Sequence, residues 1–266
     1  MKKLIDRMGI PTFAVTLLLV VVLVTACIQG QSLTILFSDI LRRVGMNGLL
    51  VLAMVPAIKS GTGPNFALPV GIEGGLISLV CCMQLDLSGW ALFWCAILMA
   101  AVVCSAMGYA YGNLMNAVRG SEMTIATYAG FSVVAFFSIL WLVLPFSNRK
   151  MGWMLGSGLR ETIALDSFGA AQIVSDFGAF TVGGITVPTG SLLVFAVGCA
   201  LVWLFFRSKT GVAIYAGGVN PRFSEATGLN IDRSRITANM LSTVLAGVGI
   251  IVYAQGYGFT QLYSGP

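Results

Sequence analysis

One carboxylate stands inside an apolar stretch of the sequence, where charged groups are rare. Glu73 lies in "NFALPVGIEGG", residues 65–75, together with Pro69 and three glycines. A charge at bilayer depth costs about 3 kcal/mol, so by default it marks a functional site such as a substrate contact. In the structural alternative, the carboxylate accepts hydrogen bonds from amides that Pro69 and the glycines free from a helix.

The other residue types exclude several kinds of chemistry. The chain contains no histidine, which excludes catalytic histidines and histidine-ligated metals. Its six cysteines lie in apolar segments without C-x-x-C spacing, and we interpret them as small packing residues. No G-x-x-x-x-G-K-[ST] loop is present to hold ATP phosphates. The sequence therefore predicts no catalytic residue, no metal site and no cofactor bound by this chain.

The composition predicts what must surround and position these residues. Of 266 residues, 57% are hydrophobic and only 9% are charged, whereas a soluble domain is typically about 25% charged. Too few charges exist to cover a water-facing surface, so the solvent must be lipid. The net charge of +5 has no basic run that would indicate nucleic-acid binding. We therefore predict an all-α polytopic membrane protein.

About seven segments are long and apolar enough to be transmembrane helices. The first is longer than a signal-peptide core, which favours an uncleaved helix with the N-terminus in the cytoplasm. Threading from there puts ten basic residues on the inner connections and five on the outer ones, as the positive-inside rule expects. Arg42 and Arg43 fit least well, because they fall just outside the second span. The predicted spans are residues 11–28, 44–58, 66–83, 90–116, 124–146, 189–206 and 236–256.

Two of these spans are unusual. The second, residues 44–58, has only 15 residues and contains Asn47 and Pro56. The third carries Pro69 and the glycines, so we expect a broken or re-entrant segment. Paired short or interrupted spans indicate a transport path. The candidate lining residues are Asn47, Asn65, Glu73, Ser78 and Glu122.

Two further patterns concern packing and charge. Glu122 follows Arg119 by three residues, so an interfacial charge is the alternative to a path residue. Gly108 and Gly112 form a small-xxx-small pattern, which predicts close packing of the fourth span against another helix.

Two long connections complete a single transmembrane domain, residues 1–266. Residues 147–188 are expected outside the cell as an interfacial or re-entrant cap, and residues 207–235 form a cytoplasmic loop. In this loop Asn220 can cap a helix, Pro221 suits its first position, and Gly228 suits a left-handed C-terminal residue. The resulting helix is too short to be stable alone and needs a docking partner. Arg222 and Glu225 could pair with each other, contact that partner or stay solvated.

The sequence of this loop resembles that of a known family. "TGVAIYAGGVNPRFSEATGLNIDRSRI", followed by an apolar span, is similar to the coupling region of bacterial ABC-import permeases for simple sugars, nucleosides and branched-chain amino acids. Phe223, where an alanine is common, and Thr227 depart from the pattern. "GIEGG" and "SEMTIATY" resemble elements of the nucleoside-type members. The matching positions are Gly211, Ala216, Gly218, Asn220, Pro221, Ser224, Gly228 and Asn230.

The resemblance implies a permease subunit in the bacterial cytoplasmic membrane that moves a small polar nutrient, a simple sugar or a nucleoside. ATP and Mg²⁺ would be bound by a separate ATPase subunit, and alternating access would be driven through the coupling helix. The implied partners also include a second permease subunit, identical or not, and an extracytoplasmic substrate-binding protein. The helix would dock on the ATPase through Gly218, Asn220, Pro221, Arg222, Glu225 and Gly228.

The resemblance also implies a fold of about ten spans with both termini inside, of which about seven are present here. The chain is therefore expected to be C-terminally truncated or to need a complementing subunit. Two other functions stay open at this stage. One is a secondary transporter driven by an ion gradient, with Glu73 titrating during the cycle. The other is a membrane scaffold that transports nothing.

Overall fold

Each predicted apolar segment forms a helix over most of its described residues in the computed structural model, which describes residues 10–30, 32–63, 68–144, 148–151 and 162–261. Among these residues, five helices are long and apolar enough to cross a membrane, namely α3, α5, α6, α8 and α11, while α2 and α4 are shorter apolar helices. The prediction of an all-α polytopic membrane protein is thereby confirmed. The bounds are α2 Ile10–Ile28, α3 Leu33–Lys59, α4 Leu68–Gln84, α5 Gly89–Ala117, α6 Glu122–Val143, α8 Thr189–Arg207 and α11 Ile231–Tyr257.

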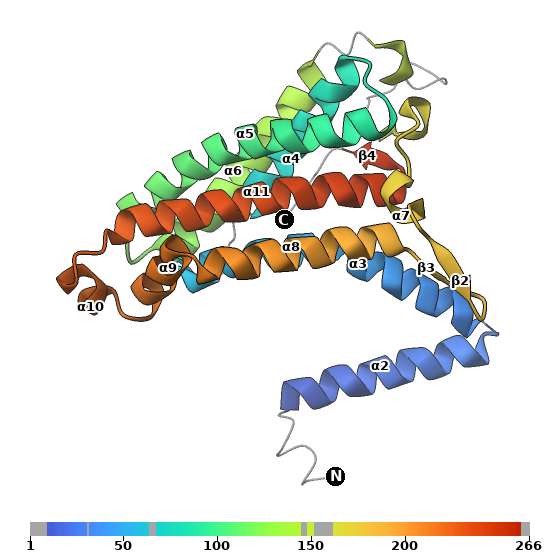
Figure 1. The fold of residues 1–266 in the computed structure, drawn as a ribbon, viewed down its shortest axis with the longest axis horizontal. Helices are drawn as coiled ribbons and strands as arrows, with labels where there is room; N and C mark the ends of the chain where they lie inside the picture. Colours follow the sequence, from blue (N-terminus) through green and yellow to red (C-terminus); the bar gives the residue numbers. More distant parts are fainter. Residues whose placement is uncertain (1–9, 31, 64–67, 145–147, 152–161, 262–266) are drawn as a thin grey trace.

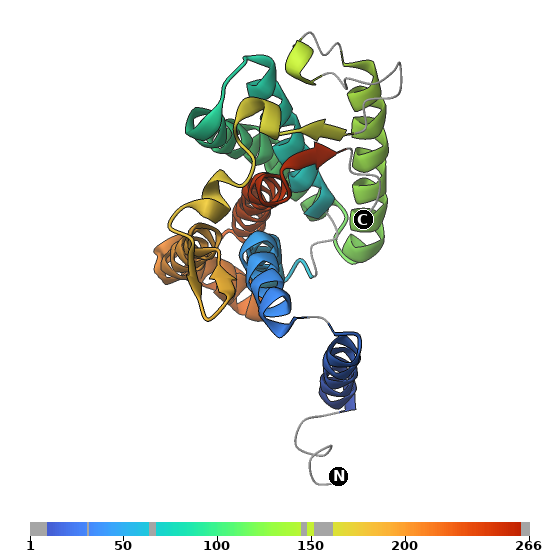
Figure 2. The same cartoon turned by 90° about the vertical axis from the view of Figure 1, so that its right-hand side faces the viewer.

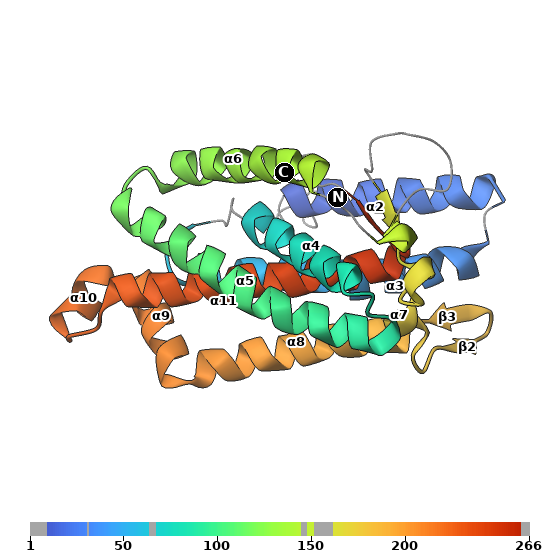
Figure 3. The same ribbon diagram turned by 90° about the horizontal axis from the view of Figure 1, so that it is seen from above.

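The last long helix, α11, lies at the centre of the bundle. It packs against α3, α4 and α5, while α8 packs against α3 and α6 against α4. Figures 1 and 3 show these helices running roughly along one direction, with α9 and α10 at one end and the short strands at the other. Figure 2 shows α2 apart from the other helices.

Glycines allow α11 to lie close to its neighbours. A Cβ atom on Gly75 of α4 would lie 2.5 Å from the carbonyl oxygen of Gly247, and one on Gly108 of α5 would overlap the Thr243 hydroxyl. The close packing predicted from Gly108 and Gly112 is confirmed, because a Cβ atom on Gly112 would also lie 2.9 Å from the Cα atom of Ile236. Without a hydrophobic driving force in lipid, such close packing stabilises helix association.

The second span is longer than the sequence pattern predicted. Helix α3 has 27 residues rather than 15, which at about 1.5 Å per residue exceeds a hydrocarbon core of about 30 Å. The apolar residues 44–58 form only its second part, and Arg42 and Arg43 lie within the helix rather than in a connection. Hydropathy marks the lipid-exposed part of a helix, whereas backbone hydrogen bonding continues into polar sequence. Pro56 lies in the last turns and does not end the helix.

The third span is not broken in the residues that the structure describes. Helix α4 is continuous from Leu68 to Gln84, and Pro69 is its second residue. In the first turn of a helix a proline removes no intrahelical hydrogen bond. The glycines serve close packing instead of interrupting the helix. The 17 residues of α4 span about 25 Å, and re-entry stays a prediction.

The described residues of the connection 147–188 form a cap at one end of the bundle. Strand β1 (Thr162–Ala164) pairs antiparallel with β4 (Phe259–Gln261), which directly follows α11, and β2 (Phe180–Val182) forms a hairpin with β3 (Ile185–Val187). Gln172, before the short helix α7 (Ile173–Asp176), donates its amide to the Gln255 carbonyl at 2.9 Å. The cap is thus held to the end of α11. Two single-turn 3-10 helices, η1 (Arg149–Met151) and η2 (Asp166–Phe168), complete it.

An ion pair fastens the start of this connection to the bundle. Lys150 Nζ lies 2.8 Å from Asp86 Oδ1 in the turn between α4 and α5. The hydrogen bond from Lys150 lowers the pKa of the exposed Asp86 carboxyl below its usual value.

The connection 207–235 is mostly helical, where the sequence predicted a loop with one short helix. Helix α9 spans Lys209–Val219, α10 spans Pro221–Ala226, and α11 begins at Ile231. Side-chain caps mark the starts of α9 and α11. The Ser208 side chain accepts a hydrogen bond from the Gly211 amide, and the Asn230 side chain accepts one from the Arg233 amide.

Candidate coupling site and substrate path

The short helix α10 is built as the sequence signals predicted. The side chain of Asn220 accepts a hydrogen bond from the Phe223 amide at 3.1 Å, and Pro221 is the first helical residue. Gly228 has a φ of +82°, and its amide donates to the Glu225 carbonyl at 3.0 Å. The next amide, of Leu229, donates to the Ser224 carbonyl at 3.0 Å. These two bonds form the Schellman motif, so both ends of the single-turn helix are fixed locally.

A glycine contact joins this region to the bundle. A Cβ atom on Gly218 would overlap the carbonyl oxygen of Lys59 at the end of α3, and it would lie 2.9 Å from the Gly61 amide nitrogen. Gly61 has a φ of +75°, which favours glycine there as well. The end of α9 therefore rests on the end of α3, backbone against backbone.

A polar cavity of about 220 Å³ lies between α10 and the ends of the long helices. Its lining residues come from the end of α3, the α5–α6 turn, α9, α10 and α11. They are Ser60, Gly61, Arg119, Glu122, Gly217, Gly218, Pro221, Glu225, Ile231 and Arg235.

Two ion pairs of opposite polarity lie at this cavity and join the start of α11 to the α5–α6 region. Arg235 Nη2 of α11 lies 2.8 Å from Glu122 Oε1 of α6, and Arg119 of the α5–α6 turn pairs with Asp232 of α11. Glu122 also accepts a hydrogen bond from the Gly120 amide at 2.8 Å. Arg235 is only 7% exposed. The α5–α6 turn and the start of α11 are therefore clamped together beside α10.

The two charged residues of α10 do not pair with each other in the part of the chain that the structure describes. Arg222 and Glu225 are both exposed, and Glu225 lines the polar cavity. Phe223, one of the departures from the family pattern, is 66% exposed on the same helix. The outer surface of α10 thus exposes the Phe223 ring and the Arg222 guanidinium.

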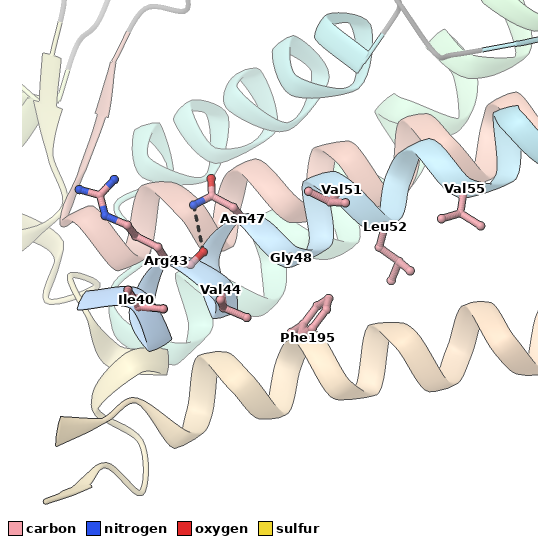
Figure 4. A pocket seen from close by; sticks show the side chains of 9 residues that line it. All are labelled: Ile40, Arg43, Val44, Asn47, Gly48, Val51, Leu52, Val55 and Phe195. Carbon is pink, nitrogen blue, oxygen red and sulfur yellow. Dashed lines mark hydrogen bonds between the residues drawn. The ribbon is translucent and has the colours of Figure 1, made fainter. Parts of the chain in front are cut away.

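The predicted path residues occupy three separate places. Asn47 is half-buried on α3 and lines an apolar pocket of about 550 Å³ beside Phe195 of α8, and its side chain donates to the Arg43 carbonyl at 3.0 Å (Figure 4). Glu73 and Ser78 are buried inside the bundle on α4. Glu122 lies in the polar cavity at the α10 end, and Asn65 lies outside the described residues.

Glu73 has no helix interruption to satisfy. Because α4 continues through Gly74 and Gly75, their amides belong to the helix. The side chain of Glu73 is 1% exposed, and its Oε1 atom makes no hydrogen bond among the described residues. Ser78 donates its hydroxyl to the Gly74 carbonyl at 2.7 Å. The Glu73 Oε1 atom therefore caps no freed amide among the described residues. A backbone contact and a substrate contact by Glu73 both stay predictions.

Comparison with known families supports the resemblance seen in the coupling region. Residues 36–265 match the family described as the branched-chain amino acid transport system permease component. The chain belongs to this family. The matched region of the permease runs from α3 to β4, and α2 lies before that region.

One curated relative is similar to part of the chain. The permease is 25% identical over 151 residues to the nucleoside ABC transporter permease protein NupB of Lactococcus lactis subsp. cremoris (strain MG1363). The aligned region is 57% of this chain and 40% of the relative, so the permease spans less than half of that relative's length in the match. No solved structure matches the permease.

Several residues of the coupling site were missed by sequence reasoning. The sequence pattern places Arg235 in a cytoplasmic loop, yet it is a buried member of α11. The pattern assigns no role to Asp232 or Gly61. Opposite charges at the ends of neighbouring spans, here Arg119 and Glu122 against Asp232 and Arg235, are the signal that would have indicated the clamp. Gly61 carries no such signal, because its role depends on where Gly218 comes to lie.

Proposed function

We propose that the permease is the transmembrane subunit of a binding-protein-dependent ABC importer in the bacterial cytoplasmic membrane. Its cargo is a small polar nutrient, with simple sugars and nucleosides as the leading classes. The observation that carries this proposal is α10, a capped single-turn helix that is exposed on its outer side. On its inner side it adjoins a polar cavity between the ends of α3, α6 and α11.

In this mechanism the chain's own residues transmit movement rather than perform covalent chemistry. A cytoplasmic ATPase subunit binds ATP and Mg²⁺ and contacts α10 through Arg222 and Phe223. Because Gly218 rests on the end of α3 and only four residues separate α10 from α11, displacement of α10 tilts α3 and α11. A second permease subunit completes the path, and an extracytoplasmic binding protein delivers the cargo at the cap end.

The name of the NupB relative and the "GIEGG" element favour nucleosides within this cargo class. Asn47 is the proposed polar contact along the path, since it and Arg43 are the polar residues in a mostly apolar wall between α3 and α8. A weakly polar path suits transport, because a high-affinity site would hold the cargo.

Uptake of radiolabelled uridine and ribose tests this function in cells that express the chain with its ATPase and binding protein. We expect uptake to require an intact ATPase, and Asn220→Ala with Pro221→Ala and Arg222→Ala to abolish it. The matched control is Asn220→Ser, which retains the helix cap and should retain uptake. Uptake that persists with an inactive ATPase would favour the ion-driven transporter, and no uptake of any nutrient would favour the scaffold.

A further inference from the structure

Three basic residues stand at the ends of α3 and α8 and at the start of α9. Lys59 Nζ lies 5.1 Å from the ring centre of Phe206 and 5.0 Å from that of Tyr215. The guanidinium of Arg207 lies 4.0 Å from the ring centre of Trp203. Lys209 follows Arg207 by two residues. We call Lys59, Arg207 and Lys209 the interfacial cation cluster.

No carboxylate neutralises this cluster in the described part of the chain. The ion pairs among the described residues involve three other basic residues, Arg119, Lys150 and Arg235. Helix α9 itself contains no acidic residue. Cations held against aromatic rings are typical of a membrane interface, where the rings lie at headgroup depth and the charges reach toward phosphate.

Helix α9 presents an apolar stripe beside the cluster. Val212, Tyr215 and Val219 follow one another at spacings of three and four residues, and they are 56%, 53% and 67% exposed. The opposite face, with Gly211, Ile214 and Gly217, is buried against the bundle. In Figure 3, α9 turns away from α8 and runs across the end of the bundle. An amphipathic helix in this position suits the plane of a membrane surface.

We propose that the interfacial cation cluster binds the phosphate headgroup of an anionic phospholipid, with the α9 stripe against its acyl chains. Charge selects the occupant, because three unpaired cations beside an exposed apolar stripe match a lipid that carries both a negative headgroup and a hydrocarbon tail. The inference requires that the chain crosses a membrane, and it is independent of cargo and ATPase. The lipid would hold the α8–α9 corner at the membrane surface, beside the contact between Gly218 and the end of α3.

Native mass spectrometry of the full purified chain tests this site, with phosphatidylglycerol and phosphatidylcholine as probes. We expect the wild type to retain phosphatidylglycerol preferentially. Lys59→Gln with Arg207→Gln should bind it about 25-fold more weakly, since each cation near an anionic headgroup contributes about fivefold. The matched control, Arg222→Gln with Arg233→Gln, removes two exposed cations from the same end of the molecule and should retain the lipid.

Three results would overturn the lipid site. Equal weakening in both double variants would mean that net charge alone attracts the lipid. Displacement by excess inorganic phosphate would mean a free anion site without a lipid tail. Loss of ATPase capture by the Lys59 and Arg207 variant in neutral-lipid nanodiscs would mean that the cluster contacts a protein partner. If the double variant does not fold, Lys209→Gln alone should weaken binding about fivefold.

Discussion

At the scale of single residues, two neighbouring glycines show how differently the same residue type is used. Gly217 and Gly218 stand side by side in α9, but only Gly218 faces the backbone of α3. A Cβ atom on Gly217 would lie 3.8 Å from the Cγ1 atom of Ile231 on α11, which is an ordinary contact distance.

This difference gives a matched prediction. Gly218→Ala should destabilise the permease by about 1–3 kcal/mol, because the methyl group forces the ends of α3 and α9 apart. Gly217→Ala should be neutral or slightly stabilising, since alanine favours the helix. The thermal midpoint of the detergent-solubilised protein measures both, and equal midpoints for the two variants would contradict the backbone contact.

The two ion pairs at the coupling site give a second prediction. Glu122→Gln should cost about 2–3 kcal/mol, because it leaves the buried charge of Arg235 without its partner. Arg119→Gln should cost less than about 1 kcal/mol, since Arg119 and Asp232 are both exposed. Adding Arg235→Met to Glu122→Gln should recover part of the loss. Denaturant unfolding in detergent distinguishes these outcomes, and a larger loss in Arg119→Gln would contradict the assigned burial.

At the scale of elements, the position of α4 depends on close contacts between its glycines and the backbone of α11. Gly71 and Gly75 face the α11 backbone, whereas Gly74 faces the side chains of Cys104 and Met107 on α5. A backbone neighbour cannot move without moving its helix, but a methionine or cysteine side chain can adjust.

Gly75→Ala should therefore destabilise the bundle by about 1–3 kcal/mol, and Gly74→Ala should destabilise it less. The thermal midpoints of the two variants in detergent provide the comparison. If Gly74→Ala were the more damaging change, α4 would pack mainly on α5 rather than on α11.

At the scale of the whole molecule, α9 and α10 lie at one end of the bundle and the β2–β3 hairpin at the other (Figure 1). Thr227 follows α10 and Thr181 lies in β2, and both are exposed. The proposed orientation puts these two ends on opposite sides of the membrane.

Labelling of single cysteines tests that orientation in a background without the native cysteines. Thr181→Cys should react with a membrane-impermeant maleimide in intact cells. Thr227→Cys should react only after the membrane is permeabilised. The reverse pattern would invert the orientation, and labelling of both in intact cells would contradict opposite sides.

The sequence by itself determined the class of protein, the approximate positions of seven apolar helices and the design of α10. These features depend on local chemistry: hydropathy over about twenty residues, and the capping preferences of Asn220, Pro221 and Gly228. The resemblance in residues 210–236 was also a property of local sequence, and it led to the correct family.

Only the tertiary structure decided which helices and side chains contact one another. The polar extension of α3, the continuity of α4 through its glycines and the burial of Arg235 all depend on neighbours distant in sequence. Gly71 and Gly75 weaken a helix locally, whereas the packing against α11 that offsets this cost comes from residues about 170 positions later. Opposite charges at the ends of two spans can suggest a contact, but which of them pair depends on how α6 and α11 pack. The pairing of Glu122 with Arg235 therefore emerged only from the fold.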